Sequence, residues 1–324
     1  MFPPVVADGI AYASAMALLA CGITLIYMCT RTFNFAHASM ATWGLFIVYT
    51  GVELYGGSPY YYFPFAFLFG GLLGAICYIW INGPLLRRRA SEVTLMMSTL
   101  GYELILLSAL QMYSDYLTLK FKLYPGLITL GTYDFRIFGI KAITVVSFVS
   151  AVGILTALHL FLVRTKFGIA IRATVENPPL ANIIGINSEK VYITSWILGG
   201  GLASLGGAMI SLVLTGSPVM GWTIIVTMFA ASILGGLYSI YGGTLGGYLV
   251  GLAEYVGMSI LAALVGPWIL TYRPVVPLII MCVALLVFPR GLAGIPWGSL
   301  LKLGRIFKGI RNKGSEGRGR VAKT

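Results

Sequence analysis

The segment RTKFGIAIRATVENPPLANIIGINSEK, residues 164–190, separates two long apolar stretches at about 139–163 and 190–215. It gathers charges, amides and two consecutive prolines in a chain that is 58% hydrophobic and only 10% charged. A stretch of about 20 apolar residues is long enough to cross a bilayer as a helix. The pattern predicts two membrane-spanning helices and, between them, a polar loop in the aqueous phase that serves as a docking surface. A plain connector is the alternative, although connectors rarely need this length.

The same apolar pattern repeats along the whole chain of 324 residues, whose mean hydropathy is +0.89. The stretches lie at about 10–30, 34–50, 60–82, 94–114, 139–163, 190–215, 222–240, 243–265 and 273–289. Such a composition excludes a soluble domain. We therefore predict an all-α, polytopic membrane helix bundle over residues 1–298. Because some stretches are short or interrupted by glycine, eight or nine spans are expected.

The distribution of Lys and Arg predicts the orientation of the chain, because basic residues favour the cytoplasmic side. With the N-terminus outside, seventeen of the 22 basic residues fall in cytoplasmic parts. The outer parts then hold only Lys120, Lys122, Arg136, Lys141 and Arg273. The nine-span arrangement therefore places the C-terminus and the loop 164–190 in the cytoplasm.

The segment 299–324 differs from the rest of the chain. Its first part, SLLKLGRIFKGIRNK, alternates apolar and basic residues at helical spacing, which is typical of a helix lying on an anionic membrane surface. A solvated tail that only fixes the topology is the alternative. The remainder, GSEGRGRVAKT, has the composition of a disordered segment. The net charge of +12 is thus a topology signal and requires no nucleic-acid partner.

Sequence motifs of common enzyme sites are absent. The chain contains no GxxxxGK[ST], GxSxG or HExxH motif, and its four cysteines form no CxxC pair. With only two histidines and ten acidic residues, an active site would be hard to assemble. We therefore expect the chain to have no catalytic residues, no metal site and no cofactor of its own.

Five polar residues in or beside the apolar stretches are candidates for lining a translocation path. An ionised side chain at the bilayer centre costs about 2.5–3.5 kcal/mol, so such residues call for an explanation. Glu103 shares a helix face with Thr99. Asn34 lies one helical turn before His37. As an alternative to lining the path, Asn34 can cap the second helix while His37 faces the bundle. For Glu103 and Glu254 the alternative is a hydrogen-bonded carboxyl group that holds helices together.

Glycine at regular spacing predicts where helices approach closely. Gly243, Gly247 and Gly251 recur every four residues and give one helix a smooth stripe, against which another backbone can pack. Glu254 follows at the edge of this stripe, so we expect it to face a neighbouring helix.

The centre of the polar loop has a readable local structure. The run of Asn177 and two prolines breaks the chain, and proline is well tolerated at the start of a short helix. The apolar turn 180–184 follows and is stopped by Gly185, while Asn187 is placed to cap the next span. We predict a short helix across the membrane face, with Glu176, Asn177 and Asn182 as polar contacts.

Four motifs occur in an order that resembles a known family. They are NFAH at Asn34–His37, RATVENPPLANIIGIN at Arg172–Asn187, ILGGLYSIYGGTLGGYLVGLAE at Ile233–Glu254 and FPRGLAG at Phe288–Gly294. Together they are similar to the permease subunits of ABC importers for branched-chain amino acids, and the likeness covers nearly the whole chain. It implies an ABC importer transmembrane domain in the plasma membrane of a prokaryote.

The resemblance also implies partners and site residues. The partners would be a second permease subunit, two cytoplasmic ATPase subunits and an external solute-binding protein, with ATP and Mg held by the ATPases alone. The region around Asn34 and His37 would lie near the translocation path. The segment 172–187 would be the coupling loop that sits in a groove of the ATPase. Its candidate coupling residues are Arg172, Thr174, Glu176, Asn177, Leu180, Ala181, Gly185 and Asn187.

One departure from the family leaves the ligand open. After NFAH the family continues with glycine and an acid, whereas this chain has Ala38 and Ser39. The cargo is therefore a branched-chain amino acid, another amino acid, an amide or urea. Two other functions remain: a self-sufficient proton-coupled carrier that uses Glu103 or Glu254, and a membrane scaffold that transports nothing.

Overall fold

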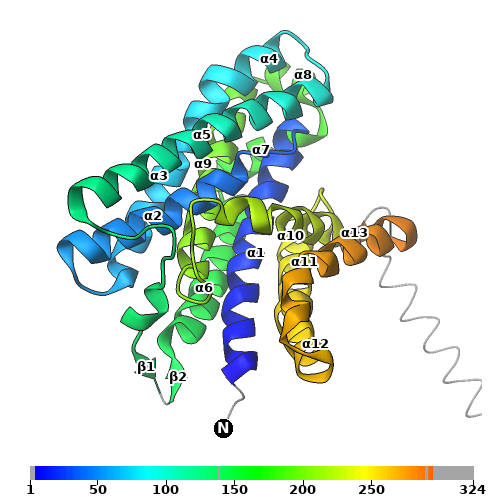
Figure 1. Cartoon of the computed structure of the whole chain (residues 1–324). Helices are drawn as coiled ribbons and strands as arrows, with labels where there is room; N and C mark the ends of the chain where they lie inside the picture. The colour runs from blue at the N-terminus through cyan, green and yellow to red at the C-terminus, as the bar shows by residue number, and fades with distance from the viewer. Residues whose placement is uncertain (1–3, 138, 289–290, 295–324) are drawn as a thin grey trace, which may run out of the picture. The chain divides into compact units, whose positions relative to one another are not determined.

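The computed structural model describes residues 4–137, 139–288 and 291–294 and is a helix bundle with one short antiparallel hairpin (Figure 1). The elements are α1 (Pro4–Thr30), α2 (His37–Tyr55), η1 (Pro59–Tyr62), α3 (Phe63–Cys77), η2 (Tyr78–Asn82), α4 (Gly83–Arg87), α5 (Glu92–Phe121), η3 (Leu130–Tyr133), β1 (Arg136–Ile137), β2 (Ile140–Lys141), α6 (Ala142–Arg164), α7 (Lys166–Glu176), α8 (Pro178–Ile183), α9 (Ser188–Ile210), α10 (Met220–Gly235), α11 (Ile240–Leu252), η4 (Ala253–Gly257), α12 (Met258–Val265), η5 (Pro267–Tyr272), α13 (Val275–Val287) and η6 (Leu292–Gly294). The all-α prediction is confirmed. The tail 299–324 and part of the FPRGLAG motif lie outside the described residues.

Seven helical segments of the described chain are long and apolar enough to cross a membrane. They are Pro4–Thr30, Pro59–Arg87, Glu92–Phe121, Ala142–Arg164, Ser188–Ile210, Ile240–Val265 and Val275–Gly294. The helices α2, with 19 residues, and α10, with 16, account for the two remaining apolar stretches of the sequence. The multi-pass architecture follows from this match between apolar stretches and helices.

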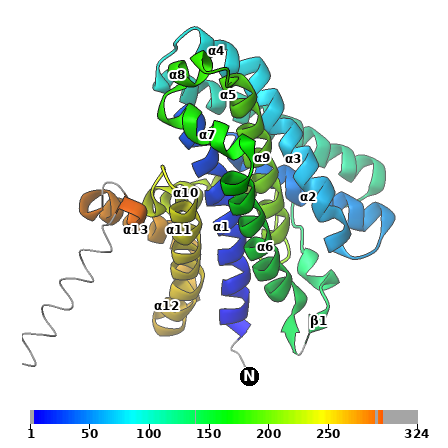
Figure 2. The ribbon, with the colours of Figure 1, turned by 180° about the vertical axis from the view of Figure 1, so that it is seen from behind.

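The helix α1 is the centre of the bundle. It packs against α6, α9, α10 and α11, and its residues from Ala11 to Ile26 are buried without interruption. A helix that is apolar all round belongs in the interior. Figures 1 and 2 show α1 between α6 and α9 on one side and α11 on the other. In both views α4, α7 and α8 lie at one end of the bundle, and the hairpin and α12 lie at the other.

Glycine sets the closest helix contacts. A Cβ atom on Gly247 would lie 2.4 Å from the Cα of Ala17, and one on Gly251 would lie 2.7 Å from the Cα of Ala13. The predicted glycine stripe of α11 is thus confirmed, and its partner is α1. An equally tight contact joins α3 to α9, where a Cβ on Gly70 would lie 2.3 Å from the carbonyl oxygen of Gly200.

We expect Gly70→Leu to lower the stability of the bundle. The new side chain would collide with the main chain of α9, which cannot move aside as a side chain can, and overpacking of this kind costs about 1–3 kcal/mol. Thermal unfolding of the detergent-solubilised protein measures the loss. Gly101→Leu is the matched control, because a Cβ on Gly101 meets no atom within 4 Å. Equal unfolding temperatures for the two variants would refute the close packing of α3 on α9.

Candidate functional site

The polar segment 164–190 folds as two short helices, α7 and α8, that join the long helices α6 and α9. Each new helix begins at a side-chain cap. Thr165 Oγ1 accepts a hydrogen bond from the amide of Gly168, Asn177 Oδ1 from that of Leu180, and Asn187 Oδ1 from that of Lys190, all at 3.1 Å. The predicted short helix with the two prolines at its start and the predicted cap at Asn187 are therefore confirmed.

The helix α8 is fastened to the start of α9. It ends before Gly185, whose φ of 88° lies in the left-handed region that glycine adopts at helix ends. The side-chain oxygen of Asn182 then accepts hydrogen bonds from the amide and the hydroxyl of Ser188, at 3.2 and 3.0 Å. The predicted polar contact at Asn182 thus lies within the chain, and it joins α8 to the first residue of α9.

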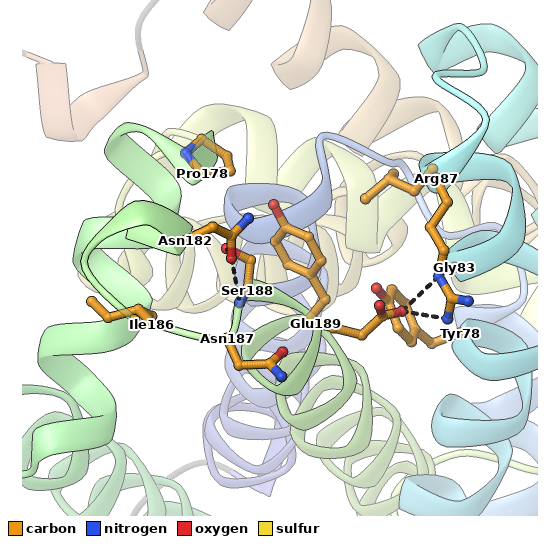
Figure 3. A pocket seen from close by; sticks show the side chains of 12 residues that line it. Tyr78, Gly83, Arg87, Pro178, Asn182, Ile186, Asn187, Ser188 and Glu189 are labelled. Atoms are coloured by element: carbon orange, nitrogen blue, oxygen red, sulfur yellow. Dashed lines mark hydrogen bonds and ion pairs between the residues drawn. The ribbon is translucent and has the colours of Figure 1, made fainter. Parts of the chain in front are cut away.

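A hollow of about 500 Å³ lies between α8 and the turn η2–α4 (Figure 3). Asn182, Ile186 and Ser188 lie on one side of this pocket, and Tyr78, Gly83 and Arg87 lie on the other. Across it, the guanidinium of Arg87 donates to Oε1 of Glu189 from Nη2 at 2.6 Å and from Nε at 3.0 Å. Because both side chains are well exposed, this ion pair stabilises the fold little.

The outer side of α8 is apolar and exposed. Leu180 is 55% exposed and Ile183 81%, and Ile184, directly after the helix, is 65% exposed. On the opposite side of α8, Ala181 is buried. The helix lies outside the segments that are long enough to span the membrane. Apolar side chains gathered on a short, capped helix outside the spans are typical of a protein-docking surface.

The other candidate coupling residues divide between the interior and the surface. Arg172 donates from Nη1 to the carbonyl oxygen of Leu162 at 2.6 Å, which places a cation at the carboxyl end of α6. Thr174 is buried, whereas Glu176 is exposed. Arg172 and Thr174 therefore hold α7 in place, and Glu176 is free to meet a partner.

Two predicted path residues on α5 hold the connection between α1 and α2. Thr99 Oγ1 lies 2.8 Å from the carbonyl oxygen of Met96 and 3.1 Å from that of Phe33, to either of which it can donate, and it accepts from the amide of Phe35 at 3.2 Å. Glu103 accepts from the hydroxyl of Ser39 at 2.7 Å and from its amide at 3.0 Å. The predicted shared face of Thr99 and Glu103 is confirmed, and Ser39, which the sequence reasoning missed, completes it.

The structure brings Asn34 and His37 to the same connection. Both side chains are fully buried. Nε2 of His37 lies 3.1 Å from the carbonyl oxygen of Leu19, so Nε2 carries the proton and Nδ1 is an acceptor. Among the described residues, neither Nδ1 of His37 nor Oδ1 of Asn34 has a hydrogen-bond partner. The connection therefore presents two buried acceptors to any donor that reaches it.

The prediction that Asn34 caps α2 is wrong. The residue that precedes the helix is Ala36, and no side chain caps it. Asn34 instead uses its main-chain carbonyl to accept from the amide of His37 at 3.3 Å, while its Nδ2 lies 3.9 Å from the sulfur of Met40. The cause is a turn at residues 35–36, which starts the helix two residues later than the polar pattern indicated.

We expect Ser39→Ala to destabilise the α1–α2 connection. The substitution removes the hydroxyl donor of a buried carboxyl group, and a buried polar group that loses its partner costs about 1–3 kcal/mol. The thermal unfolding temperature of the detergent-solubilised protein measures this cost. Ser108→Ala is the matched control, because its exposed hydroxyl bonds only to a carbonyl of its own helix. An unchanged unfolding temperature for Ser39→Ala would contradict the role given to the Ser39–Glu103 contact.

Glu254 lies apart from this cluster. It sits in η4, a π-helical turn between α11 and α12, where it accepts from the hydroxyl of Tyr12 at 3.0 Å and from Nε of Arg273 at 2.7 Å. The rings of Tyr12 and Tyr255 lie 4.5 and 5.0 Å from the guanidinium carbon. The expectation that Glu254 faces a neighbouring helix is confirmed. Its partners were missed, although a buried acid in a membrane protein calls for a cation nearby.

Comparison with known proteins agrees with this architecture. A family model described as branched-chain amino acid transport system / permease component matches residues 5–285. The chain belongs to this permease family. It is 40% identical over 294 residues to the probable branched-chain amino acid transport permease protein LivH of Methanocaldococcus jannaschii, covering 91% of this chain and 93% of that protein.

More distant relatives carry related names. The chain is 25% identical to the high-affinity branched-chain amino acid transport system permease protein BraD of Pseudomonas aeruginosa, covering 89% of this chain and 94% of that protein. It is also 25% identical to the LivH protein of the same description from Escherichia coli K12, with the same coverage. No solved structure gives a significant match. As a member of a permease family, the chain is a transporter component of the membrane.

Proposed function

We propose that the chain is the membrane-spanning subunit of an ATP-driven importer that takes up branched-chain or related amino acids. The relatives named above support the cargo class, because their names describe branched-chain amino acid transport. A second permease subunit, two cytoplasmic ATPases and an external solute-binding protein complete the assembly, and ATP and Mg bind only to the ATPases. The distribution of basic residues supports an N-terminus outside and a C-terminus inside.

The observation that carries this proposal is the exposed apolar side of α8. Leu180 and Ile183 project from a helix that is capped at its start and tied to α9 at its end. Such a helix can move with α9 as one body, and its apolar side can bind in a groove of another protein. We assign Glu176, Asn177, Leu180 and Ile183 to the contact with the ATPase. The remaining candidates stabilise the structure of α7, α8 and the start of α9. They are Thr174, Ala181, Gly185, Asn187 and Arg172, which bonds to α6.

The translocation path would pass the connection between α1 and α2. Asn34 and His37 offer their unpartnered acceptors there, and Thr99 and Glu103 hold the backbone around them. Glu254 would act from its ion pair with Arg273 as a structural tie beside that path. In the alternative, a proton-coupled carrier, Glu103 or Glu254 would have to exchange protons with the two sides of the membrane in turn.

Site-directed cross-linking tests the docking surface. In a Cys282→Ser background, which removes the one exposed cysteine of the described chain, a cysteine replacing Ile183 should form a cross-link to the ATPase subunit in native membranes. A cysteine replacing Leu119, which is 84% exposed near the far end of α5, should form none. Cross-linking from both positions, or from neither, would refute the assignment of α8 as the ATPase contact.

A further inference from the structure

Two hollows follow one another along the seam between α3 and α6. The first measures about 590 Å³ and is lined by Ser58, Tyr60, Tyr61, Tyr133, Phe135 and Val146. The second measures about 850 Å³ and begins at Phe63 on α3 and at Ser150 on α6. Phe63 is two residues from Tyr61, and Ser150 is one helical turn from Val146. The hollows therefore adjoin, and each takes one wall from the α3 side and the other from α6.

The second hollow is an apolar groove of membrane dimensions. Among its lining residues only Ser150 and Thr194 are polar, and its floor is formed by α9. On α6 it reaches from Ser150 to Phe161, which is about 17 Å along a helix axis. One leaflet of a bilayer has a hydrocarbon depth of about 15 Å. The groove thus has the length and the chemistry of a site for an acyl chain.

The first hollow has the chemistry of a cation site. Its Tyr60 donates to Oδ1 of Asp134 at 2.6 Å, and its Tyr133 donates to Oε1 of Glu53 at 3.0 Å. A carboxylate behind each phenol makes the rings richer in electrons, and electron-rich aromatic faces attract ammonium groups. The nearby Lys141 does not occupy the site, because its ammonium bonds to Asp8 at 2.9 Å.

One residue that lines the same hollow, Ser58, carries a polar atom without a partner. The hydroxyl oxygen of Ser58 is buried and has no hydrogen-bond partner among the described residues. A buried hydroxyl gains free energy from an acceptor such as a phosphate oxygen. A rotation of the Ser58 side chain about χ1 would turn this donor toward the hollow. The hollow would then combine a surface for a cation with a donor for an anion, which together match the two charges of a zwitterionic head group.

We propose that the seam between α3 and α6 binds one phospholipid whose head group carries an ammonium. The ammonium lies against the rings of Tyr60, Tyr61, Tyr133 and Phe135, the phosphate accepts from Ser58, and an acyl chain fills the groove over α9. A spanning helix of a protein partner is the competing occupant of the groove, and the experiments below distinguish it from a lipid. This site is independent of the function proposed above and requires only that the chain lies in a membrane.

Native mass spectrometry of the purified full-length chain tests the site with two probes, dioleoyl phosphatidylethanolamine and dioleoyl phosphatidylglycerol. The wild type should retain the first about tenfold more strongly, which corresponds to about 1.4 kcal/mol. The double variant Tyr61→Leu/Phe135→Leu removes two of the four rings and should reduce this preference. Its control, Tyr55→Leu, changes a tyrosine that is 83% exposed outside the hollow and should keep it.

A second pair of variants tests the groove. Ala157→Trp fills it from an exposed position on α6 and should lower the retention of both probes about tenfold, while Val152→Trp, on another side of α6, should not. Thermal unfolding confirms that each variant is folded. Equal retention of the two probes by the wild type, or an unchanged preference in the double variant, would overturn the proposal. A dimer that Ala157→Trp dissociates would also overturn it and would assign the groove to a protein contact.

Discussion

Leu180→Asp and Ile183→Asp should each abolish most of the coupling between ATP hydrolysis and uptake. Both side chains lie on the exposed side of α8, so under the proposed docking the substitutions remove apolar contact with the ATPase and place a charge in the interface. A central interface residue is worth about 2 kcal/mol or more, which corresponds to a loss of about thirtyfold in affinity for each variant. We expect uptake by the assembled transporter to fall at least that far.

The measurement is substrate-stimulated ATPase activity together with uptake in the same vesicles. Leu127→Asp is the matched control, because it makes the same change at a leucine that is 70% exposed, lies outside the spanning segments and is away from α8. The hydrogen bonds from the caps of α8 do not involve either side chain, so the variants should unfold at the wild-type temperature. Variants that are folded and retain both activities would show that α8 is only a connector.

Arg273→Met should destabilise the protein more than any other single substitution considered above. It removes the cation from Glu254, whose side chain is only 4% exposed, and leaves a buried carboxylate without its ion pair. Breaking a buried ion pair from one side costs about 3–5 kcal/mol. Thermal unfolding in detergent should show this loss. The double variant Glu254→Gln/Arg273→Met should recover most of the stability, because no buried charge then remains.

The ion pair between Lys141 and Asp8 is the control for this cycle. Its lysine side chain is 40% exposed and its aspartate side chain 17%, so this pair is less buried than Glu254–Arg273 and Lys141→Met should have a smaller effect than Arg273→Met. If Arg273→Met proved no more destabilising than Lys141→Met, the Glu254–Arg273 pair would not be the structural tie described above. The double variant Glu254→Gln/Arg273→Met also distinguishes an ATP-driven importer from a proton-coupled carrier. An importer driven by ATP keeps its uptake without Glu254, whereas a carrier that uses Glu254 loses it.

The helices of this fold could be predicted from sequence because the bilayer imposes their length. Each apolar stretch became one helix, or a helix with a π-helical turn, as in α11–η4–α12. The local structure of the polar loop was equally readable. Asparagine caps, prolines at a helix start and glycine at a helix end act over three or four residues, and they shaped α8 as its sequence indicates.

The partners of the buried polar residues were not predictable in the same way. Tyr12 and Glu254 are 242 residues apart, and Ser39 and Glu103 are 64 apart. Which helix supplies the hydrogen-bond partner of a buried polar side chain depends on how the helices pack, and many apolar helices are available as neighbours. The error at Asn34 has a similar cause, since a cap depends on the residue at which the helix starts. A buried turn moved that start to His37.

The energy source of transport tests the account most directly. Vesicles that contain this chain, its partner permease and the two ATPases should accumulate labelled leucine when Mg-ATP reaches the ATPases and the solute-binding protein is on the opposite side. Omission of ATP or of the binding protein should abolish the accumulation. A proton gradient alone should produce none in vesicles that contain only this chain. Accumulation driven by that gradient would contradict the account and would identify a self-sufficient carrier.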